Sequence, residues 1–127
     1  MKTIIAGGRN YKFTKEDIEF LNSIKDEISE VVSGKARGAD NEGEDWAKSN
    51  NIPVKEFPAK WGNLNAREVF IKTNSRGYSY NSLAGFQRNE EMAKYADCLI
   101  IFSGGSGTEH MYKIAKENGL KIYDRRK

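Results

Sequence analysis

The sequence has one cysteine, one histidine and two prolines, and it contains no long apolar run. A single cysteine cannot form a disulfide within the chain, so a cytoplasmic location is expected. Cys98 lies inside an apolar run and is expected to be an inert core residue. His110 alone cannot supply a histidine cluster, so we expect neither a metal site nor a resident cofactor. The apolar runs are too short to span a bilayer and we recognise no signal peptide, so no membrane contact is expected.

The charge of the chain is also small. Its 21 Lys and Arg nearly balance its 18 Asp and Glu, which gives a formal net charge of +3. This excess permits contact with phosphates but argues against a DNA-binding surface, because the basic residues cluster only at the end of the chain. The composition and the 127 residues are typical of one folded domain spanning 1–127.

The most informative stretch is 97–108. Consecutive apolar residues from Cys98 to Phe102 predict a strand buried on both faces, and a turn containing Gly104, Gly105 and Gly107 follows. Thr108 then opens a segment with helical spacing. A strand, a glycine-rich loop and a helix in this order form either a phosphate cradle, where helix amides face an anion, or a plain tight turn.

Two similar turns occur earlier. The predicted strand 3–6 ends at Gly7 and Gly8, and Thr14 then caps a helix. The predicted strand 30–33 ends at the turn 34–40, where Asp40 either caps the next helix or accepts hydrogen bonds from a ribose; capping is the preferred interpretation. Further elements are expected as an edge strand at 52–57, a helix at 88–96, a helix at 109–118 closed by Gly119, a strand at 120–123 and a solvated tail at 125–127.

The segment 61–85 is rich in Asn, Gly and aromatic residues, and only 69–71 reads as a possible strand. We interpret it as a lid or a contact between protomers of a homodimer, or else as a plain insertion.

Five strands alternating with four helices predict a three-layer, doubly wound α/β fold with a parallel sheet in the order 3-2-1-4-5. In such folds ligands bind beyond the carboxyl ends of the strands, where the strand order reverses. The loops that begin at Gly7, Gly34 and Gly104 all leave the sheet at that edge, so we expect one ligand site there.

Four segments, 6–9, 33–40, 84–92 and 104–108, together resemble the SLOG superfamily. This Rossmann-like group includes the LOG phosphoribohydrolases and the DprA-like proteins, and the chain most resembles its small YspA-type, YpsA-related family of phages and bacteria. The resemblance implies a nucleotide or nucleotide-derived ligand. Arg37 and Arg88 offer planar forks for phosphate or a carboxylate, and Arg9 either binds ligand or faces solvent. The residues expected to bind the ligand are Gly7, Gly8, Arg9, Ser33, Gly34, Arg37, Gly38, Asp40, Arg88, Asn89, Glu91, Gly104, Gly105, Ser106, Gly107 and Thr108.

The LOG enzymes cleave the bond between a base and ribose 5′-monophosphate with an Arg and a Glu. Arg88 falls on the Arg position, but Met111 stands at the Glu position and is expected in the core. A nucleotide-binding or sensing protein is therefore the first hypothesis. The second hypothesis is a nucleotide N-glycosidase that uses Arg88 with Glu91 or Glu109. The third hypothesis is a DprA-like nucleic-acid binder.

Overall fold

The computed structural model describes residues 1–34, 38–57, 71–73, 79–81 and 84–126. Its main sheet is parallel and has five strands in the order β3-β2-β1-β6-β7. Because β6 and β7 are the fourth and fifth strands of this sheet along the chain, the expected order and fold class are confirmed. The strands are β1 (Lys2–Ala6), β2 (Glu30–Ser33), β3 (Val54–Glu56), β6 (Cys98–Ile101) and β7 (Lys121–Asp124).

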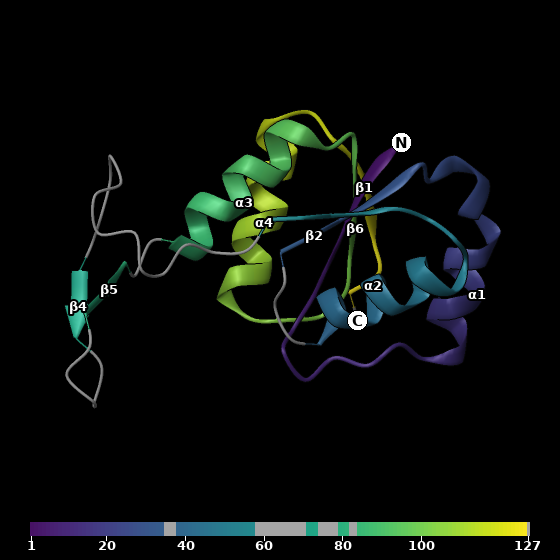
Figure 1. The fold of residues 1–127 in the computed structure, drawn as a ribbon, viewed down its shortest axis with the longest axis horizontal. Helices are drawn as coiled ribbons and strands as arrows, with labels where there is room; N and C mark the ends of the chain where they lie inside the picture. The colour runs from purple at the N-terminus through teal and green to yellow at the C-terminus, as the bar shows by residue number, and fades with distance from the viewer. Residues whose placement is uncertain (35–37, 58–70, 74–78, 82–83, 127) are drawn as a thin grey trace.

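Helices cover both faces of the sheet (Figure 1). On one face, α1 (Lys15–Ser23) and α2 (Ala39–Ser49) pack over Ile5, Ile100 and Phe102. On the other, α3 (Ala84–Tyr95) and α4 (Ser106–Glu117) cover side chains such as Ile4 and Leu99. Alternate residues of β1 and β6 thus supply opposite cores, which explains why these strands are apolar at consecutive positions. Cys98 is buried in the first core, as expected.

Three helices begin earlier than the sequence indicates, and one of them is α3, which begins at Ala84 although a helix at 88–96 was expected. The N-cap of α2 is Gly38, with φ +76°, so the prediction that Asp40 caps this helix is wrong; Asp40 lies inside the first turn. The N-cap of α4 is Gly105, and Thr108 lies in the first turn of that helix rather than before it. The N-caps of α2 and α4 are glycines, which have no side chain to accept a hydrogen bond. The expected starts at Asp40 and Thr108 depended on such a side chain.

The first helix is capped as predicted. The Thr14 side chain accepts from the Asp17 N–H, and Asp17 accepts in return from the Thr14 N–H, which completes a capping box. The helix ends at Ser23 and is followed by a short 3-10 turn, η1 (Lys25–Glu27). Gly119 follows the end of α4 with φ +72°, as a C-terminal glycine should.

The end of the chain is not the solvated tail that we expected. Arg126 forms ion pairs with Glu109 and Asp124, and the Arg125 guanidinium lies 4.5 Å from the centre of the Phe20 ring. In the segment 61–85, the strands β4 (Ile71–Thr73) and β5 (Ser79–Asn81) form an antiparallel pair. The expected strand at 69–71 overlaps β4 only at Ile71, since residues 69 and 70 lie outside the described part. The lid or dimer interpretation of this segment stays a prediction.

Candidate functional site

The loops after β1, β2 and β6 meet at the carboxyl edge of the sheet. The Gly8 N–H donates to the Ser103 carbonyl over 2.9 Å, and the Gly8 carbonyl accepts from the Ala39 N–H over 3.3 Å. A Cβ at Gly7 would lie 2.7 Å from the Ala39 Cβ. The glycines at 7 and 8 therefore let the first loop fit between the start of α2 and the loop after β6.

Gly38 and Gly104 are glycines for reasons of packing. Gly38 has a positive φ, and a Cβ there would overlap the Gly8 carbonyl. A Cβ at Gly104 would overlap the Thr108 hydroxyl and lie 2.6 Å from the Gly8 amide nitrogen. Thr108 is buried at 8% exposure beneath this loop.

Gly105 and Gly107 have no such reason. Neither has a positive φ, and apart from its chain neighbours and the backbone of its own helix, no described atom lies within 4 Å of a Cβ built at either position. Both are exposed, at the N-cap and in the first turn of α4. In the first turn of a helix the N–H groups lack carbonyl partners within the helix and carry partial positive charge. The backbone is thus open to solvent where an anion is favoured.

Arg88 and Asn89 join the loops to each other from α3. The Arg88 guanidinium donates through Nη1 to the Gly34 carbonyl and through Nε to Asn89 Oδ1, over 3.0 Å. Asn89 is buried at 6% exposure, and its Nδ2 lies 3.4 Å from the Gly107 carbonyl and 3.2 Å from His110 Nδ1. Burial lowers the pKa of Arg88, and the negative charge of Asp40 partly opposes this. One network therefore connects the loop after β2, α3 and the start of α4.

Two carboxylates of α2 lie near the carboxyl end of β2. Asp40 is buried at 8% exposure and acts on Arg88 through its charge. Glu44, one helical turn later, is buried at 3% and accepts from the Ser33 hydroxyl over 2.6 Å. Ser33 thus lies at the expected edge of the sheet, and its hydroxyl donates its hydrogen bond to the Glu44 carboxylate. We did not expect Glu44 near the site, although its spacing of four from Asp40 puts both on one helix face.

The expected catalytic carboxylates lie differently. Glu109 is exposed and pairs with Arg126 over 2.7 Å, and Glu91 is exposed on α3. Met111 is buried at 2% exposure, as its spacing predicts. Arg9 and Ser106 are exposed, whereas Arg37 lies outside the described residues. The ligand roles of these residues stay predictions.

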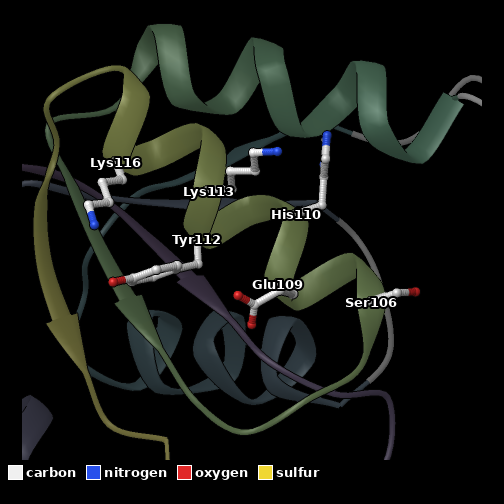
Figure 2. A pocket seen from close by; sticks show the side chains of 6 residues that line it. All are labelled: Ser106, Glu109, His110, Tyr112, Lys113 and Lys116. Atoms are coloured by element: carbon white, nitrogen blue, oxygen red, sulfur yellow. The ribbon is translucent and has the colours of Figure 1, made fainter.

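A hollow of about 460 Å³ runs along the outer side of α4 (Figure 2). Its lining residues all belong to that helix, and Tyr112 within it packs under the Arg126 guanidinium at 4.4 Å. The lining residues are Ser106, Glu109, His110, Tyr112, Lys113 and Lys116. Ser106 and His110 lie at the end of this hollow nearest the loop after β6, and its other lining residues include Lys113 and Lys116 farther along α4.

The described residues contain neither a metal-binding cluster nor a helix that could span a membrane. In the described ranges, no group of three or more His, Cys, Asp or Glu is arranged to hold a metal ion. Among the described helices, none is long and apolar enough to cross a membrane.

Comparisons with known proteins agree with this fold. The described fold is similar to that of DNA processing protein A (DprA) from Streptococcus pneumoniae, with a TM-score of 0.66 and 17% sequence identity. The match covers 97% of this chain and 49% of the DprA chain, so the chain corresponds to about half of that protein. No curated protein matches the sequence significantly. The model of the YspA, cpYpsA-related SLOG family (YAcAr) matches residues 1–63. Over these residues, which hold the first two glycine loops, the chain is similar to the YspA, cpYpsA-related SLOG family.

Proposed function

We propose that the protein binds a nucleotide or nucleotide-derived phosphate ligand at the carboxyl edge of its sheet, as a binding or sensing protein. The observation that carries this proposal is the pair Gly105 and Gly107. Neither positive φ nor contacts with described residues require glycine at these positions. Glycine inside a helix costs about 0.5–1 kcal/mol relative to alanine, and this cost applies to Gly107 in the first turn of α4, whereas glycine is well accepted at the N-cap position of Gly105. Close approach of a ligand to the backbone accounts for this cost.

The groups around this backbone suit a phosphate. In the first turn of α4 the amides of Ser106 and Gly107 point out of the helix end, and Thr108 adds an amide. Arg88 uses two of its five N–H donors for Gly34 and Asn89, and no partner for the others is found among the described residues. Its positive charge next to the loop favours an anion there.

The positions of the carboxylates favour binding over hydrolysis. A glycosidic hydrolase needs a carboxylate beside the sugar. Glu109 is paired with Arg126, Glu91 is exposed, and Met111 is in the core. Asp40 is the carboxylate whose charge acts on Arg88, and it becomes the first candidate for that role if hydrolysis is observed.

A thermal-shift screen tests the proposal. The compounds are nucleoside mono-, di- and triphosphates, cyclic nucleotides, NAD and ADP-ribose, and each mixture is afterwards assayed for free base. A compound at about a hundred times its dissociation constant stabilises the fold by roughly 2.7 kcal/mol. A shift with the compound intact supports a binding protein. Released base supports the N-glycosidase, and loss of that activity in Asp40→Asn, but not in Glu91→Gln or Glu109→Gln, would assign its carboxylate. No shift from any compound would refute the proposal.

A nucleic-acid role is the remaining alternative, because the structural relative is named for DNA processing. A gel shift with single-stranded and duplex DNA, repeated at rising salt, addresses it. Tight binding that weakens steeply with salt, without any nucleotide shift, would favour that role over ours.

A further inference from the structure

We propose that Phe86 and His110 form a subsite that stacks the base of the bound nucleotide, next to the phosphate loop. This inference rests on the proposed function and adds the part of the ligand that the glycine loops do not recognise. Phe86 lies in the first turn of α3 and is 42% exposed, and it is the large hydrophobic residue found exposed in the described ranges. Its ring centre lies 4.3 Å from that of His110, with 47° between the planes.

Phe86 is close to the phosphate loop because Asn89 connects them. Phe86 precedes Asn89 by three residues, an advance of about 4.5 Å along a helix. The Asn89 amide contacts both the Gly107 carbonyl and the His110 ring. The two rings therefore lie within one helical turn of the loop amides, a separation that a ribose can bridge between a phosphate and its base.

The hydrogen bonds of this network also define which His110 nitrogen carries the proton. The Arg88 Nε–H can only donate, so the Asn89 atom that it contacts must be the amide oxygen. The other end of that amide, the NH₂ group, therefore faces His110 Nδ1 and donates to it. Nδ1 is then the acceptor of the ring, and the neutral imidazole carries its proton on Nε2. Burial lowers the pKa of His110, which favours this neutral form.

A nucleobase has the chemistry that such a subsite would recognise. Its flat π-system can stack on an exposed aromatic ring, and its edge carries acceptors for the Nε2–H of His110. Among bases, a purine covers more of the Phe86 ring than a pyrimidine does. We therefore expect purine nucleotides to bind more tightly than pyrimidine nucleotides with the same number of phosphates.

Calorimetry with matched compounds tests the subsite. AMP, ADP, ATP and CMP are titrated into the wild-type protein, Phe86→Ala and Phe86→Tyr, beside the base-free compounds ribose 5-phosphate, pyrophosphate and triphosphate. Loss of base stacking in Phe86→Ala should weaken the tightest of the purine nucleotides about 5- to 150-fold. Affinity for the base-free compounds should stay within about twofold. Phe86→Tyr keeps an aromatic ring and should bind like the wild type.

The other possible outcomes count against either the base subsite or the proposed function. If the base-free compounds bind the wild type as tightly as the nucleotides do, the phosphate site stands and the base subsite is refuted. Unchanged nucleotide affinity in Phe86→Ala also refutes the subsite. If neither these compounds nor those of the thermal-shift screen bind the wild type, the proposed function itself fails. Size-exclusion chromatography of Phe86→Ala provides the last check, because a change of oligomeric state would assign Phe86 to a contact between protomers instead.

Discussion

Replacing Gly107 by Ala should separate the two explanations of the loop after β6, because the explanations predict opposite effects. The added methyl group meets no described atom within 4 Å, and φ at this position is not positive. Alanine restricts the unfolded chain, so the ligand-free protein should keep its stability or gain about 0.4–1 kcal/mol. The affinity for the nucleotide should change in the opposite direction. A methyl group that displaces phosphate from one charge-assisted hydrogen bond should weaken nucleotide binding by about 1.5–3 kcal/mol.

Gly104→Ala is the matched control, since it adds the same methyl group three residues earlier in the same loop. There the Cβ would overlap the Thr108 hydroxyl and lie 2.6 Å from the Gly8 nitrogen. Overpacking of this kind costs about 1–3 kcal/mol. Urea denaturation of the three proteins measures stability, and calorimetry measures affinity for the nucleotide that binds the wild type. If Gly107→Ala is destabilised as much as Gly104→Ala, or if its affinity is unchanged, the open glycine is no evidence for a ligand.

Three further predictions concern single side chains. Arg88→Ala should weaken nucleotide binding by about 1.5–3 kcal/mol, and calorimetry showing unchanged affinity would remove Arg88 from the site. Because burial lowers the pKa of His110, its protonation opposes folding: its effect on stability is absent above its ordinary pKa of 6.5 and grows as the pH falls below it. Urea titrations between pH 5 and 7 should show this loss for the wild type and a smaller one for His110→Gln; equal slopes would contradict it. Burial raises the pKa of Cys98 to about 11, so iodoacetamide at pH 8 should label it only after denaturation, and rapid labelling of the folded protein would contradict the buried position.

The architecture could be predicted from the sequence because its strands are buried on both faces. Ile4 and Ile5, neighbours in β1, serve opposite cores, and such strands read as continuous apolar runs. The sequence indicates starts of α2 and α4 that are too late, because a helix start is recognised in a sequence by an N-cap side chain that accepts a hydrogen bond. Gly38 and Gly105 act as N-caps through their backbone alone. Three-residue strands such as β4 are too short for alternation to stand out among polar and aromatic neighbours.

The site could be predicted only in outline. The convergence of three loops follows from the rule that parallel strands end at one edge, and contacts such as Gly8 with Ser103 confirm it. The connections within the site join residues far apart in the chain, and no local pattern indicates them. Arg88 donates to the carbonyl of Gly34, 54 positions earlier, and Arg126 near the end of the chain forms an ion pair with Glu109.

These connections bear on how a binding protein could report its ligand. Asn89 lies between the Gly107 carbonyl and Arg88, and Arg88 holds the Gly34 carbonyl. A phosphate on the Gly107 loop would compete for Arg88, because charge-assisted hydrogen bonds to an anion are stronger than those to a neutral carbonyl. Gly34 would then lose this hydrogen bond while the ligand stays bound, whereas a hydrolase would hold Arg88 on the substrate only until product leaves. A ligand that stays intact and shifts the amide signals of both Gly34 and Gly107 in NMR would thus favour sensing over turnover.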